Sequence, residues 1–172
     1  MCGQGSVGER DTEAGDTIGN CLREASSSTS WQDFLVRSAH GVRRIVLREP
    51  ELFAPAVALA PEAPWARPPL GNLRWIETFL NTLLCYGFDD DEAVAVYRSF
   101  TTFLLGQLLL EVAGHVTVPG SERTPAPSTG ALEQFPNLYR LQPKLSRDHG
   151  AAEFEDALEA LLDRIERLRS AS

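Results

Sequence analysis

The stretch from Asp90 to Gly114 constrains the fold more than any other part of the sequence. Four carboxylates at residues 89–92 lie at its start, where the positive end of a helix dipole favours them. From Phe100 to Val112, apolar residues occur nearly all the way round a helical wheel. Such a helix must be covered on every side, within its own subunit or by another one. Because one small domain seldom surrounds a helix completely, this pattern points towards oligomerisation.

The final segment with helical periodicity, Gly150 to Ser170, carries a regular apolar seam. Its residues follow one another at spacings of 4, 3, 4 and 3: Phe154, Leu158, Leu161, Ile165 and Leu168. This is the a/d spacing of helices that pack along their length.

The other elements also have the period of helices, and no alternating strand pattern occurs, so the predicted fold class is all-α. Ser30 is a good N-cap, with Asp33 completing an approximate capping box, and Pro50 ends that helix. Gly87 is placed for a left-handed C′ position. Besides the two helices above, the predicted helical segments are 17–25 (weak), 31–48, 51–59, 70–86 and 131–139 (short and irregular). We expect a disordered tail over residues 1–16, an extended Pro-rich connector at 61–69 and a loop at 118–130.

Composition excludes several classes of function. Sixteen basic against twenty-four acidic side chains give a net charge of −8. This charge argues against a chain that binds nucleic acid or an anionic membrane on its own. The longest apolar run, Phe103–Leu110, is interrupted by Gly106 and Gln107 and is too short to cross a bilayer. Without a signal peptide, the chain is predicted to be cytoplasmic. No nucleophile–base motif, metal-ligand spacing or phosphate-binding loop occurs, so we expect no enzyme activity, no metal and no cofactor.

Four short motifs occur in an order that resembles the ligand-binding domain of the tetracycline-repressor (TetR) family, closest to its tetracycline-repressor C-terminal subclass. They are Ser30–Leu35, Tyr86–Phe88, Phe103–Gly106 and Phe154–Leu158, and the resemblance covers about residues 31–169. It implies a ligand cavity in each subunit, a DNA-binding head on the N-terminal side, and a homodimer. In that dimer the long helix and the final helix of each subunit form a four-helix bundle. The residues this assigns to the dimer interface are Phe103, Gly106, Leu109, Phe154, Leu158, Leu161 and Ile165. Close approach of two helices would explain Gly106, which costs about 1 kcal/mol in mid-helix relative to Ala; neutral variation is the alternative.

The sequence departs from the family pattern in two respects. A three-helix DNA-binding head does not fit before Trp31, and residues 1–30 lack a run of basic side chains, so we interpret 17–25 as the remnant of a linker helix. Thr102 stands where the tetracycline-binding members carry a His that ligates magnesium. Thr78 and Thr82 stand where they carry an Asn and a Phe that hold the drug. Because Thr is a poor substitute for imidazole, magnesium–tetracycline is not the expected ligand.

Six residues are candidates for binding a small apolar or amphipathic effector: Trp75, Thr78, Thr82, Arg98, Thr101 and Thr102. The first three share one helix face beside a more apolar stripe, which suits a cavity wall; a partly exposed surface with incidental Thr is the alternative. Arg98 interrupts an apolar helix, where an ion pair within the protein is favoured over a ligand carboxylate.

Two functions remain. The first is the effector-binding and dimerisation domain of a TetR-type regulator, a repressor whose DNA contacts are made only by a head outside residues 31–169. The second is a headless interaction protein that pairs with a full-length paralogue or sequesters a small molecule.

Overall fold

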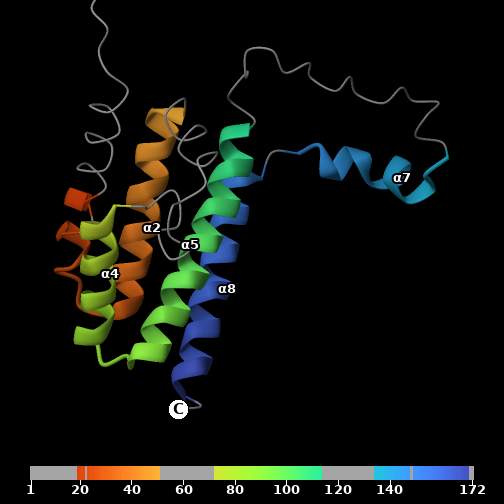
Figure 1. Cartoon of the computed structure of the whole chain (residues 1–172). Helices are drawn as coiled ribbons and strands as arrows, with labels where there is room; N and C mark the ends of the chain where they lie inside the picture. The colour runs from red at the N-terminus through yellow and green to blue at the C-terminus, as the bar shows by residue number, and fades with distance from the viewer. Residues whose placement is uncertain (1–18, 22, 51–71, 114–133, 148, 171–172) are drawn as a thin grey trace, which may run out of the picture.

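The computed structural model describes residues 19–21, 23–50, 72–113, 134–147 and 149–170, and these contain helices and no strand (Figure 1). The all-α prediction is confirmed. The helices are α2 (Trp31–Arg48), α4 (Leu73–Cys85), α5 (Asp90–Ala113), α7 (Pro136–Leu145) and α8 (Gly150–Ser170). Residues 19–21 and 23–25, which precede α2, are helical and lie within the predicted 17–25. The predicted tail at 1–16, helix at 51–59, connector at 61–69 and loop at 118–130 lie outside the described residues.

The ends of α2 follow the predicted local chemistry. The Ser30 hydroxyl accepts a hydrogen bond from the Asp33 backbone N–H at 3.1 Å, and Glu49, just before Pro50, is the C-cap. The capping box is only half formed, because the Asp33 carboxylate instead accepts from Arg37 Nε at 3.0 Å. An ion pair one turn along the helix has replaced the contact that would have returned to Ser30.

The turn between α4 and α5 is fixed by a glycine and a reciprocal cap. Gly87 has φ of 84°, as predicted for the left-handed C′ position, and Phe88 after it is buried against Trp31. Asp89 Oδ1 accepts from the Glu92 N–H at 2.8 Å, and Glu92 Oε2 accepts from the Asp89 N–H at 3.0 Å. This capping box starts α5 at Asp90. At its other end, α4 starts at Leu73 rather than the predicted Leu70, because Asn72 caps it.

The central helix is α5, which packs against α8, α4 and α2 (Figure 1). Phe100, Leu104 and Leu108 are fully buried along its inner side, whereas Leu109 is 36% and Leu110 74% exposed on the outer side. By length and composition alone α5 could cross a membrane, with a mean hydropathy of 1.4 over 18 residues of which 39% are buried. The interrupted run 103–110 is shorter than the apolar length of the whole helix, so that run alone understates how apolar α5 is. The packing of three helices around it accounts for much of its apolar character.

The seam of α8 faces its own chain. Phe154, Leu158, Leu161 and Ile165 are all buried in the core of a single copy, and the Phe154 ring lies 5.3 Å from that of Phe103 on α5. These four side chains therefore have little surface left for a second copy. The predicted homodimer, and the assignment of these residues to its interface, stay predictions.

Helix α7 extends away from the other helices (Figure 1). It begins at Pro136, which fits the first turn of a helix because its missing N–H would be unpaired there. It continues to Leu145, past the predicted end at Tyr139, even though Pro143 lies inside it. It has no buried residue, and Leu138, Tyr139 and Leu145 are exposed. The apolar residues of this segment therefore predicted neither where α7 ends nor that the helix has no buried side chain.

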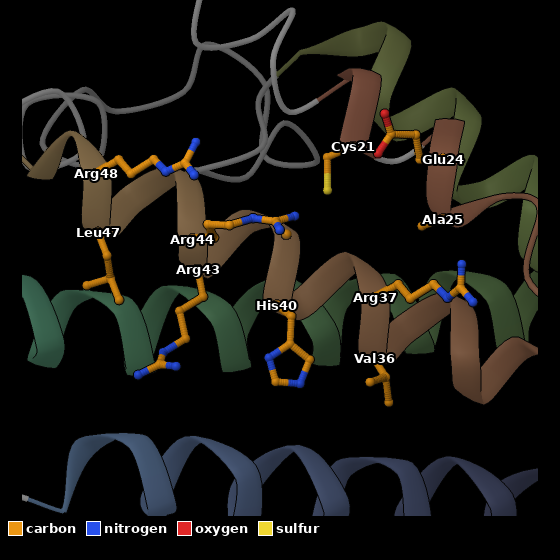
Figure 2. Close-up of a pocket in the computed structure, with 11 residues that line it drawn as sticks. Cys21, Glu24, Ala25, Val36, Arg37, His40, Arg43, Arg44, Leu47 and Arg48 are labelled. Carbon is orange, nitrogen blue, oxygen red and sulfur yellow. The ribbon is translucent and has the colours of Figure 1, made fainter.

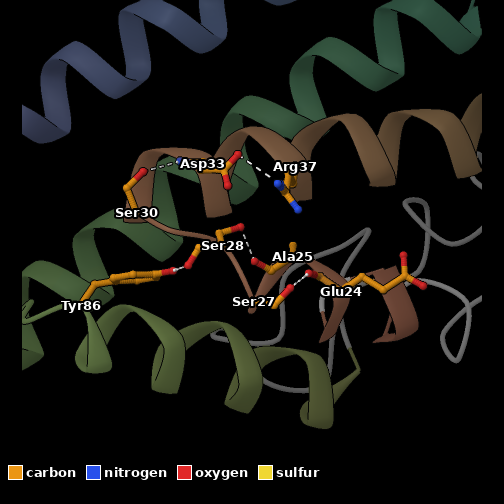
Figure 3. A network of polar contacts seen from close by, with 8 residues as sticks. All are labelled: Glu24, Ala25, Ser27, Ser28, Ser30, Asp33, Arg37 and Tyr86. Carbon is orange, nitrogen blue, oxygen red and sulfur yellow. Dashed lines mark hydrogen bonds and ion pairs between the residues drawn. The ribbon is translucent and has the colours of Figure 1, made fainter.

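Residues 26–30 are tied to α4 by side-chain contacts (Figure 3). The Tyr86 hydroxyl donates to the Ser28 carbonyl at 2.6 Å. The Ser26 and Thr82 hydroxyl oxygens lie 3.4 Å apart. These contacts hold the segment that leads into α2 against the neighbouring helix.

Candidate functional site

The interior between α2, α4 and α5 is filled by aromatic rings around Phe79. The Phe79 ring centroid lies 5.3 Å from that of Phe34 on α2, 5.1 Å from Phe100 on α5, and 5.0 Å from Trp75 one turn earlier on α4. Tyr97 of α5 completes the group, 6.0 Å from Trp75. This cluster is the part of the core in which an apolar molecule would find aromatic partners.

Two polar atoms in this interior have no hydrogen-bond partner among the described residues: Trp75 Nε1 and Ser38 Oγ. Both residues are buried, Trp75 at 1% and Ser38 at 0% exposure. Helices α2 and α4 run in opposite directions (Figure 1), and their Phe34 and Phe79 rings are in contact. Ser38 comes one turn after Phe34 and Trp75 one turn before Phe79. Along the helix axes, both residues therefore lie towards the same end from that contact. The Trp75 N–H on α4 and the Ser38 hydroxyl on α2 are thus both without a described hydrogen-bond partner.

The four predicted threonines differ from Ser38 because each donates its hydroxyl hydrogen to the carbonyl one turn earlier on its own helix. Thr78 donates to Arg74 O at 2.8 Å and Thr82 to Thr78 O at 2.7 Å. On α5, Thr101 donates to Tyr97 O and Thr102 to Arg98 O, both at 2.8 Å. Their hydroxyl hydrogens are therefore already engaged, although their oxygens can still accept.

The six predicted effector residues do not lie together. Trp75 and Thr101 are buried in the core, and Thr82 is buried beside Ser26. Thr78 is half-buried, whereas Arg98 and Thr102 are exposed on the outer side of α5. Of the six, Trp75 alone combines full burial with an unused polar atom. The structure adds Ser38, whose position as the one polar residue in the apolar stripe of α2 was the available sequence signal.

A polar contact centred on Arg43 links α2, α5 and α8. Arg43 of α2 binds the Glu111 carboxylate of α5 through both Nε, at 2.9 Å, and Nη2. Its guanidinium also lies 5.0 Å from the centre of the Phe154 ring on α8. The hydrogen bond to Glu111 raises the pKa of the Arg43 guanidinium above its usual value. Within the described ranges, no group of three or more His, Cys, Asp or Glu side chains could hold a metal ion.

Comparison with known proteins identifies the class of this fold. The sequence matches the family described as "Tetracyclin repressor-like, C-terminal domain" over residues 25–169. A crystal structure described as "a possible TetR family transcriptional regulator" from Streptomyces coelicolor A3(2) superposes with a TM-score of 0.63 at 21% identity, covering 94% of this chain and 77% of that one. TetR from Acinetobacter baumannii AYE gives 0.60 at 23% identity, covering 92% and 73%. Among curated proteins, none matches this sequence.

These findings define an all-α regulator domain of the TetR type. The chain belongs to the tetracyclin repressor-like C-terminal domain family, as the order of its motifs predicted. The two structural relatives, at this level of identity, support the fold.

Proposed function

We propose that this chain is the effector-binding and dimerisation domain of a TetR-type repressor, and that the effector binds between α2, α4 and α5 beside Ser38 and Trp75. The observation that carries the proposal is the pair of buried polar atoms without partners on facing helices. A buried donor left unpaired costs about 1–3 kcal/mol, so such atoms call for an explanation. A ligand that hydrogen-bonds to both atoms supplies one.

The site defines the chemistry of the effector. Trp75 Nε1 can only donate, so the effector must present an acceptor, while Ser38 can donate or accept. The surrounding rings of Phe34, Phe79 and Phe100 favour an apolar, preferably aromatic, body. A small molecule of this kind agrees with the apolar or amphipathic effector predicted from the sequence.

Binding at this position would couple directly to conformation. The Phe34 and Phe79 rings are in contact across α2 and α4, so an effector that enters between these helices has to move them apart. An effector shifts such an equilibrium only by its difference in affinity for the two arrangements. In a dimer with attached DNA-binding heads, the shift would move the recognition helices away from half-sites about 34–36 Å apart and release DNA. No catalytic step is part of this proposal.

A thermal-shift screen tests the effector site with two matched sets of probes, small aromatic ketones such as acetophenone and alkylbenzenes of the same shape such as ethylbenzene. We expect the ketones to raise Tm more, because only they offer Trp75 an acceptor. Trp75→Phe keeps a ring but removes the N–H and should abolish that difference. Trp31→Phe, at a buried Trp packed on Phe88, is the control and should preserve it. Equal Tm shifts for both probe sets, or an undiminished ketone effect in Trp75→Phe, would contradict the proposal.

We also propose that a second copy covers the outer side of α5. Arg98, Thr102, Gly106 and Leu109 follow one another there at spacings of 4, 4 and 3, and all are exposed. A Cβ added at Gly106 would meet nothing within 4 Å in its own chain, which leaves room for another helix to approach closely. Leu168 on α8, 46% exposed, adds apolar surface on the second helix of the predicted bundle. Phe103 contributes less, since it is half-buried against Phe154.

Size-exclusion chromatography with light scattering tests this interface at micromolar concentration. Leu109→Glu should yield a monomer with an unchanged helical circular-dichroism spectrum, because the side chain is exposed in one copy. Leu161→Glu should instead unfold the domain, since it buries a charge in the core of one chain. A Leu109→Glu variant that remains dimeric would exclude the outer side of α5, and a wild-type monomer would exclude the dimer altogether.

A further inference from the structure

A cleft of about 680 Å³ lies between the helical segment 19–25 and α2 (Figure 2). Cys21, Glu24 and Ala25 form one wall, and residues of α2 between Val36 and Arg48 form the other. Neither Ser38 nor Trp75 lines it, so it is separate from the proposed effector site. Its volume is within the range of about 300–1,000 Å³ usual for small-molecule sites.

The cleft is rich in positive charge although the whole chain carries a net charge of −8. Arg37, Arg43, Arg44 and Arg48 all line it. Two of these already have carboxylate partners: Arg43 binds Glu111 and Arg37 binds Asp33. In Figure 2, Arg43 and His40 point towards α8, whereas Arg44 and Arg48 lie on the other side of α2, towards Cys21.

Arg44 and Arg48 are the two cations of the cleft that are not neutralised within the described part of the chain. Arg44 lies close enough to the Cys21 thiol to act on it electrostatically, and neither Arg44 nor Arg48 forms an ion pair with a described carboxylate. The two stand one helical turn apart, a spacing at which like charges repel by a few tenths of a kcal/mol. An anion placed between them would turn this repulsion into attraction.

The floor of the cleft is built by a close contact between its two walls. A Cβ added at Gly41 would overlap the Cys21 sulfur, so a larger residue there would require the Cys21 side chain to move. Burial raises the pKa of the Cys21 thiol, which keeps it in the neutral form at physiological pH. The thiol therefore supplies no negative charge to compete with a bound anion.

We propose that this cleft binds a small organic anion whose carboxylate or phosphate group lies between the guanidinium groups of Arg44 and Arg48. Guanidinium groups bind both kinds of anion through paired N–H donors. Ala25, Val36 and Leu47 offer the apolar part of the ligand a surface on the same walls. Glu24, the one carboxylate among the described lining residues, disfavours a second negative group at its end of the cleft.

Amide NMR titration of the full chain tests the site with two probes, sodium phosphate and sodium hexanoate, at constant ionic strength set with sodium chloride. We expect saturable shifts concentrated at residues 21–25 and 41–48. Saturation by phosphate shows that the anionic group suffices, and saturation by hexanoate alone shows that the apolar part is required. Either result supports the site.

The double variant Arg44→Gln/Arg48→Gln should raise the apparent Kd by about tenfold or more, the effect of losing charge-assisted hydrogen bonds. Arg140→Gln, which removes an exposed arginine of α7 outside the cleft, is the matched control and should leave the Kd unchanged. The proposal is overturned if neither probe gives saturable shifts at millimolar concentration. It is equally overturned if the double variant binds as tightly as the wild type.

Discussion

The unpartnered hydroxyl of Ser38 gives the most direct test of the physical reasoning about the core. In Ser38→Ala, the Oγ that is fully buried and without a partner among the described residues is removed, while Cβ remains. We expect this variant to be more stable than the wild type in the absence of an effector. Most core substitutions destabilise, so the sign of the change is itself informative.

The size of the effect follows from three terms. Relieving a buried, unpaired polar group returns about 1–3 kcal/mol. Alanine also has a higher helix propensity than serine, by up to about 0.5 kcal/mol, and Ser38 lies in mid-helix. Against these stands the lost packing of one atom at a fully buried position. We expect a net gain of about 1 kcal/mol in the free energy of unfolding, which is a rise in Tm of about 2–4 °C for a chain of this size.

Urea unfolding followed by circular dichroism measures this change, with all variants at the same protein concentration because a dimer makes stability concentration-dependent. Ser30→Ala is the matched control, since it makes the same chemical change where the hydroxyl caps α2. It should lower the free energy of unfolding by about 1 kcal/mol. If Ser38→Ala is destabilised like the control, the Ser38 hydroxyl has a partner in the folded protein and the argument for an effector beside it fails.

Three further predictions concern other parts of the molecule. Because burial raises the pKa of the Cys21 thiol, iodoacetamide should label Cys21 more slowly at pH 7 than it labels the exposed Cys85. Peptide mass spectrometry measures the two labelling rates, and equal rates would contradict the burial of Cys21. Glu111→Ala should lower the free energy of unfolding by about 2–3 kcal/mol, because it leaves the largely buried Arg43 without its carboxylate partner. Adding Arg43→Met should recover part of this loss in a double-mutant cycle, whereas additive losses would show that the two residues are not coupled. Gly106→Ala should stabilise an isolated subunit by about 1 kcal/mol, because alanine favours a helix more than glycine does. The same change should raise the dimer dissociation constant, measured by light scattering on dilution, and an unchanged constant would argue against a close helix crossing at this residue.

The elements that could be predicted from sequence are those decided by neighbouring residues. Ser30 caps α2, Gly87 takes a left-handed conformation, and α8 spans Gly150–Ser170 as expected. In each case the deciding interaction is made within one helical turn or follows from one apolar period. The reciprocal cap of Asp89 and Glu92 is equally local, but the charges of these residues alone do not predict it.

Local sequence does not predict which element packs against the apolar face of a helix. The 4–3–4–3 spacing in α8 correctly indicated a packed seam, but spacing is the same whether the partner is another chain or the same one. Phe154 and Leu161 turned out to pack within one copy. The candidate site had a similar difficulty, because residue type does not reveal whether Thr78 or Thr101 donates to its own helix. The cleft beside Arg44 depends on where residues 19–25 lie in space, which no local pattern specifies.

The way residues 19–30 are anchored has a mechanical consequence. They touch α2 where Cys21 lies over Gly41, and they touch α4 where Tyr86 holds Ser28. A segment fastened to two helices rotates when those helices separate. Opening the core around Trp75 would therefore change the direction in which the polypeptide enters at residue 19, so that a small movement inside the domain becomes a rotation of whatever precedes it.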